Sequence, residues 1–198
     1  NRLAVLLYEQ GSTAEARPLY ERALSIQEKA LGRDDPSVAL SLNNLAGLLH
    51  AQGSYAEARP LQERALSIWE KVFGKDHTLV ATSLNNLATL FYTQGSFAEA
   101  HPLYQRALAI REKALGKDHL HVAHSLNNLA ALLWTRGSHV EARLLLERAL
   151  AIYEEAFGKD HPDVLAQVAA RWLKGATPER DWLVRHALRS AVKRGELG

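Results

Sequence analysis

Asparagine side chains recur along this chain at a constant spacing of 42 residues and offer hydrogen-bonding chemistry. One series comprises Asn1, Asn43, Asn85 and Asn127. From the second member onward, another asparagine follows directly in the sequence. A carboxamide carries both donors and acceptors, so it can pair with an extended peptide backbone or satisfy a buried polar group. The spacing predicts that the same hydrogen-bonding group stands at equivalent places in successive structural units.

Rings recur seven residues after each member of this asparagine series. They are Tyr8, His50, Tyr92 and Trp134. Positions 43, 47 and 50 are four and three residues apart, so on a helix they share one stripe. Such a ring offers a flat apolar platform, which together with the amides suits an extended partner chain. The alternative is that rings at helix ends only pack against their neighbours.

Histidines raise the question of a metal site, since the chain has nine of them and His119, His121 and His124 are close in sequence. Metal ligands must converge on one point at ~2.0 to 2.2 Å. His77 and His161 lie a whole period from His119 and cannot meet it. We interpret His77, His119 and His161 as connector and helix-start residues, together with the neighbouring aspartates. The chain also has no cysteine, and we expect no metal and no other cofactor.

Catalytic patterns are missing from the sequence. It contains no nucleophile elbow, no phosphate-binding glycine loop and no pair of acids set apart from the repeat. The many Glu and Arg residues, such as Glu21 and Arg22, are typical of a solvated helix face. We therefore expect a protein that is not an enzyme.

Composition indicates a soluble globular chain, with 47% hydrophobic residues, 23% charged residues and a net charge of +2. No apolar run approaches the ~20 residues that span a bilayer, and no signal-peptide pattern opens the chain. We expect no membrane association and a cytoplasmic location. The chain starts inside a helical pattern and has no methionine, so we also expect it to be a segment of a longer protein.

The elements that position the asparagines and rings are set by the same period. The phrase Ser-Leu-Asn-Asn-Leu-Ala begins at Ser41, Ser83 and Ser125. Two glycine series, represented by Gly53 and Gly74, divide each period into two segments, and glycine ends helices readily. A fixed period predicts a stacked array of one small unit, which buries its apolar face only against its neighbours. The length of 42 residues alone also fits HEAT or armadillo units and WD40 blades, and it is the two glycine positions that indicate a pair of helices in each unit.

The second unit illustrates the predicted hairpin. Its first helix begins at Pro36 and runs to about Gln52. Its second helix follows Ser54, which we expect to form a capping box with Glu57, and ends near Gly74. Small residues recur at three positions and should allow the paired helices to approach closely; they are Ala46, Ala58, Ala65 and their equivalents.

The residue pattern resembles the long tetratricopeptide repeats of the kinesin light chain type. In the second unit the signature positions are occupied by Leu42, Leu45, Ala46, Leu49, Gly53, Tyr55, Ala58 and Ala65. The third unit carries Leu84-Asn85-Asn86-Leu87-Ala88, the segment 94–100 and Gly116-Lys117-Asp118-His119. Ordinary repeats of this family have 34 residues, and the extra residues here lie at the end of the second helix and in the connector. The likeness covers residues 1 to about 166.

This resemblance implies an all-α, right-handed superhelical solenoid whose concave groove binds an extended peptide or partner segment. Residues 1–166 form the array, with a partial first unit and further units near 36–74, 78–116 and 120–158. In this family the stripe of the first helix lines the groove, which implies peptide contacts from Asn43, Asn85, Asn127, Tyr8, His50, Tyr92 and Trp134. For Asn44, Asn86 and Asn128, which point away from the groove, a role in satisfying buried groups between helices stays open.

The pattern decays after Val164, and residues 167–198 are expected to form a degenerate helical cap. A helix start at Thr177-Pro178 opens its last helix. The cap resembles, weakly, the terminal HEAT-type helices of the DNA alkylation repair family. Residues 171–198 hold seven Lys and Arg against three Asp and Glu, so a phosphate contact through Arg185, Arg189 and Lys193 is a further hypothesis.

Three hypotheses about function therefore stay open, and we favour a protein-interaction scaffold with a protein or peptide partner. The second is a structural spacer, a self-associating surface or the sensor arm of a larger signalling protein. The third is nucleic-acid contact through the basic end of the chain.

Overall fold

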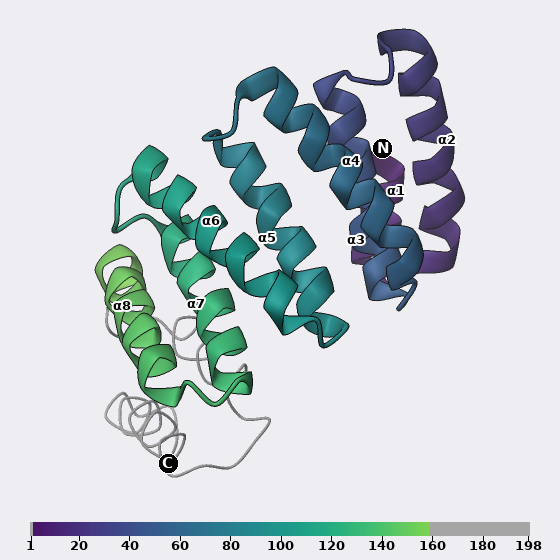
Figure 1. Ribbon diagram of the computed structural model, residues 1–198. Coiled ribbons are helices and arrows are strands. Elements are labelled where there is room, and N and C mark those ends of the chain that lie inside the picture. Colours follow the sequence, from purple (N-terminus) through teal and green to yellow (C-terminus); the bar gives the residue numbers. More distant parts are fainter. Residues whose placement is uncertain (1, 159–198) are drawn as a thin grey trace.

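The computed structural model describes residues 2–158, and these residues form helices and connectors without a strand. Consecutive helices pair into four antiparallel hairpins that stack side by side into an elongated array (Figure 1). The hairpins are α1 (Arg2–Glu9) with α2 (Thr13–Leu31), α3 (Pro36–Ala51) with α4 (Tyr55–Phe73), α5 (Thr78–Thr93) with α6 (Phe97–Leu115), and α7 (Leu120–Thr135) with α8 (His139–Phe157). The predicted all-α solenoid is confirmed, and the predicted cap at 167–198 lies outside the described residues.

The connectors fix where the first helix of each hairpin begins. The Asp35 carboxylate accepts a hydrogen bond from the Ser37 backbone N–H at 2.8 Å, and Pro36 takes the first helical position. His77 and His119 act in the same way through Nδ1, which accepts from the backbone N–H two residues later at 3.2 and 3.0 Å. The interpretation of these histidines as helix-start residues is confirmed. Between residues 2 and 158, no group of three or more His, Cys, Asp or Glu is arranged to hold a metal ion.

The capping box predicted at Ser54 and Glu57 is wrong. The Ser54 side chain makes no capping hydrogen bond, and its backbone carbonyl accepts from the N–H groups of Glu57 and Ala58. The Glu57 carboxylate lies instead 2.6 Å from Arg17 Nη2 on the preceding hairpin. The N-cap serines of the other outer helices, Ser12, Ser96 and Ser138, have the same backbone angles, with φ near -80° and ψ near 60°, and make no side-chain cap hydrogen bond either. The local backbone conformation, which is not the extended one that a capping side chain needs, therefore accounts for the missing box.

The core runs along the whole array between and within the hairpins. One continuous cluster of buried apolar side chains includes residues from all four hairpins. The alanines at the three predicted positions are all 0% exposed; they are Ala46, Ala58, Ala65, Ala88, Ala100, Ala107, Ala130, Ala142 and Ala149. Because these side chains are small, the paired helices pack closely. The predicted role of the alanines is confirmed.

The two helices of a hairpin differ in how they meet the next hairpin. Direct contacts join α3 to α5 and α5 to α7, whereas the second helices stand farther apart. We call α1, α3, α5 and α7 the inner helices, and α2, α4, α6 and α8 the outer helices. Long ionic side chains bridge the outer helices at a repeated spacing, through the pairs Arg64–Glu28, Arg106–Glu70 and Arg148–Glu112. The closer spacing of the inner helices places them on the concave side of the stack.

A larger side chain at a buried alanine should force a hairpin apart. We expect Ala58→Leu to lower the free energy of unfolding by about 1 to 3 kcal/mol, because a well-packed core cannot accommodate added methyl groups without strain. The quantity is measured by urea denaturation followed by circular dichroism. Ala56→Leu, at an exposed position of the same helix, is the matched control and should change it by less than about 0.5 kcal/mol. Equal effects of the two variants would contradict the close-packing role.

Candidate functional site

The paired asparagines join adjacent inner helices. Asn86 Nδ2 donates to Asn43 Oδ1 at 2.8 Å, and Asn128 Nδ2 donates to Asn85 Oδ1 at 2.7 Å. Each bond joins residues 43 apart, which is one more than the period. The first asparagine of one repeat therefore contacts the second asparagine of the next repeat. The second asparagine of each pair therefore connects the repeats through the amide of the first. This is the helix-to-helix role that the sequence left open for Asn86 and Asn128.

The rings of the predicted series also contact the next repeat. His50 Nε2 lies 3.2 Å from Thr93 Oγ1, and the Tyr92 hydroxyl lies 3.0 Å from Thr135 Oγ1. Each ring also packs on the first or second residue of its own outer helix, with centroid distances of 4.4 to 5.6 Å in the pairs His50–Tyr55, Tyr92–Phe97 and Trp134–His139. These rings therefore have packing partners, and their role in binding stays a prediction.

The three predicted asparagines differ in accessibility. Asn43 is half-buried, whereas Asn85 is 4% exposed and Asn127 is 9% exposed. The expectation that Asn85 and Asn127 lie open along a groove therefore does not match the structure. The inner helices approach so closely at this level that α7 covers the Asn85 amide. We assign Asn85 to stacking of the repeats, because its Oδ1 is already used by Asn128.

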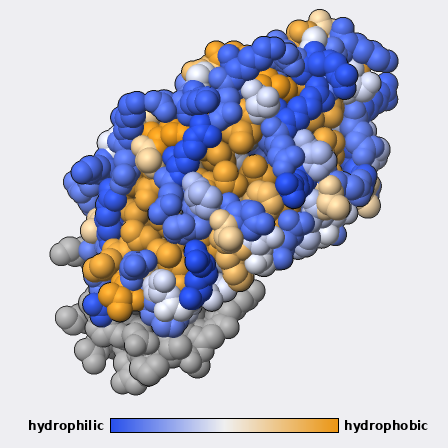
Figure 2. Space-filling model, viewed as in Figure 1, coloured by the Kyte–Doolittle hydropathy of each residue, from blue (hydrophilic) through white to orange (hydrophobic). Residues whose placement is uncertain are grey.

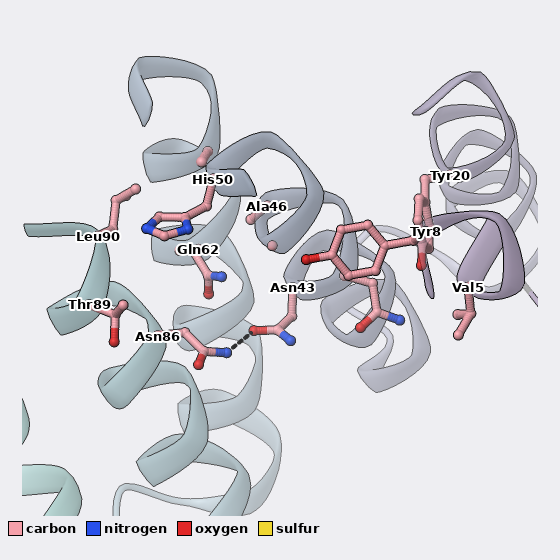
Figure 3. Close-up of a pocket in the computed structure, with 13 residues that line it drawn as sticks. Val5, Tyr8, Tyr20, Asn43, Ala46, His50, Gln62, Asn86, Thr89 and Leu90 are labelled. Atoms are coloured by element: carbon pink, nitrogen blue, oxygen red, sulfur yellow. Dashed lines mark hydrogen bonds between the residues drawn. The ribbon is translucent and has the colours of Figure 1, made fainter. Parts of the chain in front are cut away.

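A hollow of about 380 Å³ lies where α1, α3 and α5 face one another (Figure 3). Three of the predicted contact residues line it, namely Tyr8 from α1 and Asn43 and His50 from α3. In Figure 3, Tyr8 reaches toward Asn43 from one side, and the Asn86 amide meets Asn43 from the other. Carbon walls are supplied by Val5, Ala46, Ala58 and Leu90. The hollow thus combines apolar walls with amide, hydroxyl and ring groups.

The hollow carries no formal charge at neutral pH. Its lining contains no Asp, Glu, Lys or Arg. Burial lowers the pKa of His50 below its ordinary value, so the imidazole is neutral at pH 7. The hollow therefore offers a partner neutral hydrogen-bonding groups and apolar contacts.

The face of the molecule shown in Figure 2 carries hydrophilic rows with apolar patches between them.

The lining also contains residues that the sequence analysis did not assign to a binding role, among them Val5, Tyr20, Gly47, Gln62, Thr89 and Leu90. Gly47 and Gln62 each differ from their counterparts in every other unit. The positions equivalent to Gly47 hold Val5, Thr89 and Ala131, and those equivalent to Gln62 hold Tyr20, Tyr104 and Leu146. Comparing the units position by position would have revealed the departures, although not that both residues face one hollow.

Other residues of the prediction lie outside the described part of the chain. They are Asn1 of the asparagine series and the three basic residues proposed for phosphate contact, Arg185, Arg189 and Lys193. The segments that weakly resemble HEAT-type helices, 171–174 and 181–189, also fall there. The nucleic-acid hypothesis therefore stays a prediction.

Comparison with known proteins identifies the family. Residues 1–53 and 37–113 match the tetratricopeptide repeat, and residues 122–163 match it through a second description of the same repeat. The chain belongs to the tetratricopeptide repeat family. Repeats of this family generally mediate protein–protein interactions and are generally non-enzymatic. No curated protein sequence matches the chain.

Solved structures narrow the type of repeat. A Podosopora anserina protein with nearly identical TPR-like repeats of the kinesin light chain kind is 28% identical, with a TM-score of 0.82 over 99% of this chain and 94% of that one. A second structure of these repeats is 29% identical, with a TM-score of 0.80 over 98% of this chain and 93% of that one. BtubC (BKLC) from P. vanneervenii is 27% identical, with a TM-score of 0.79 over 99% of this chain and 80% of that one. The predicted resemblance to kinesin light chain repeats is confirmed.

Within residues 2–158, no helix combines the length and apolar character needed to cross a bilayer.

The Asn85–Asn128 bond should contribute measurably to stacking. We expect Asn85→Ala to lower the free energy of unfolding by about 1 to 3 kcal/mol, because it leaves the buried Asn128 amide without its acceptor. The double variant with Asn128→Ala should cost less than the sum of the two single changes, by about 1 kcal/mol. The half-buried pair Asn43 and Asn86, treated in the same way, should show weaker coupling. Additive effects in the buried pair would contradict this assignment.

Proposed function

We propose that the inner face of this array binds an extended segment of a partner protein, with the hollow between α1, α3 and α5 as its principal contact. The single observation that supports this most strongly is the convergence of Tyr8, Asn43 and His50 on one hollow. These residues come from two different hairpins, so the hollow exists only in the stacked array. The protein acts as a non-catalytic scaffold in this proposal.

The shape and chemistry of the hollow support an extended ligand rather than a folded surface. The amides of Asn85 and Asn128 are used between repeats, whereas the half-buried Asn43 and Asn86, which pair with each other, line the hollow together with Tyr8 and His50. A peptide strand gains affinity from a small number of well-placed contacts, while its remaining residues lie over neutral surface. Trp134 and Tyr92 lie farther along the inner helices, where they can extend the contact toward α7.

The proposal is tested by selecting binders from a displayed library of random nonapeptides and measuring their affinities. We expect Tyr8→Ala to weaken the selected peptides about tenfold, because the ring forms part of the wall of the hollow. Fluorescence polarisation gives the affinities, and circular dichroism confirms unchanged helix content. Gln105→Ala, at an exposed position of α6, is the control and should bind as the parent does. Peptides that bind equally well to the Tyr8 and Trp134 alanine variants would rule out the inner face.

A further inference from the structure

Gln62 is a buried carboxamide whose oxygen has no hydrogen-bond partner, as is also true of the Ser83 hydroxyl and the Asn127 oxygen, neither of which lines the hollow. The residue is 5% exposed, and its Oε1 is sealed from solvent without a hydrogen-bond partner in the structure. Its side chain nevertheless belongs to the lining of the hollow, and Figure 3 shows it between His50 on one side and Thr89 and Asn86 on the other. Buried polar groups in proteins are nearly always paired, so an exception beside an open hollow requires an explanation.

The neighbouring hairpin shows what is missing at Gln62. There, the Thr89 hydroxyl lies 2.9 Å from the Tyr104 hydroxyl, which satisfies both groups between α5 and α6. The equivalent positions between α3 and α4 are Gly47 and Gln62. Glycine supplies no hydroxyl, and a Cβ built at Gly47 would meet nothing within 4 Å. The absent side chain at Gly47 therefore both leaves Gln62 unpaired and opens the space in front of it.

Both features reduce the stability of the free protein. A glycine in the middle of a helix costs conformational entropy relative to almost any other residue. A buried amide without a partner carries a desolvation cost that nothing repays. Departures of this kind from local rules are expected at functional sites, where a ligand supplies the missing interaction.

We propose that the space at Gly47 and Gln62 is a specificity subsite that accepts a carboxamide side chain, glutamine or asparagine, from the partner segment. The inference rests on the proposed function and deepens it. Rotation of the Gln62 carboxamide presents its Oε1 to the hollow, where the entering amide donates a hydrogen bond to it. The entering side chain occupies the volume that a residue-47 side chain would otherwise fill. Val5, Ala46 and Leu90 contact its aliphatic carbons.

The lining selects a carboxamide over other side chains. A charged side chain would lose its hydration without gaining a counter-ion, since no carboxylate or cationic group lines the hollow. An apolar side chain would leave the Gln62 amide unpaired. The oxygen and nitrogen of Gln62 exchange places when the amide rotates by half a turn, and a partner amide carries both a donor and an acceptor. It therefore complements Gln62 in either orientation.

The direct test uses three small probes that differ only in the side chain and carry no primary carboxamide elsewhere: the N-acetyl N-methylamides of glutamine, glutamate and leucine. Binding is followed by ¹H–¹⁵N correlation spectra of the labelled protein, reading the side-chain NH₂ of Gln62 and the backbone of Thr89. We expect the glutamine probe to shift these signals with a dissociation constant on the order of millimolar. The glutamate and leucine probes should bind about tenfold more weakly. Equal binding of all three probes, or no shift with any of them, would overturn the subsite.

The matched variants are Gly47→Thr and Ala131→Thr. Gly47→Thr places at Gln62 the hydroxyl that Thr89 provides to Tyr104, and it fills the subsite. We expect it to unfold at a temperature no lower than that of the parent and to lose the glutamine-induced shifts. Ala131→Thr makes the same chemical change at the equivalent position of α7, away from the hollow, and should leave those shifts intact. Retained binding in the Gly47→Thr variant would contradict the proposed location.

Peptide selection separates this inference from the proposed function. Selected nonapeptides should carry glutamine or asparagine at one fixed position, and replacing it by leucine should weaken binding about tenfold. If peptides bind through Tyr8 without such a preference, the carboxamide subsite is wrong and the peptide-binding function stands. If the glutamine probe binds but no peptide is selected, the subsite stands and peptide binding along the inner face is wrong.

Discussion

The structure depends on one constraint, which is that a helical hairpin of this sequence cannot bury its apolar surface alone. Alanines such as Ala58 close each hairpin internally, but the remaining apolar faces are covered only by the hairpins before and after. Stability is therefore shared between neighbouring units, as expected for a quasi-one-dimensional array. Because the sequence repeats, each contact between units recurs with a constant offset, and the position of one hairpin fixes that of the next.

Polar side chains follow the same rule and divide between the two sides of the stack. On the inner helices, asparagine amides such as those of Asn85 and Asn128 pair across adjacent repeats. On the outer helices, arginines reach back to glutamates of the preceding unit, as Arg106 does to Glu70. Much of the hydrogen-bonding capacity of the inner face is consequently used in holding the array together. Beside the hollow, an unpaired oxygen remains at Gln62, opposite the glycine at position 47.

The fold was largely predictable because its signals are local and repeated. Pro36 and the glycines near positions 53 and 74 mark helix ends through backbone preferences that need no tertiary partner. The predictions at Ser54 and Asn85 did not hold, for two different reasons. Ser54 shares with the other N-cap serines a backbone conformation in which no side-chain cap forms. The environment of Asn85 is set by a different repeat, because α7 covers its amide by supplying Asn128.

The sequence by itself determined the hairpin unit, its period and its small packing residues, because these follow from backbone preferences and apolar periodicity. The family was indicated by the resemblance of its residue pattern to known repeats. Only the tertiary structure decided which polar side chains remain available. Hydrogen bonds between residues 43 positions apart depend on how closely two inner helices approach, and no local pattern encodes that distance. The open space at Gly47 and the unpaired amide of Gln62 became visible only when three inner helices were placed around them.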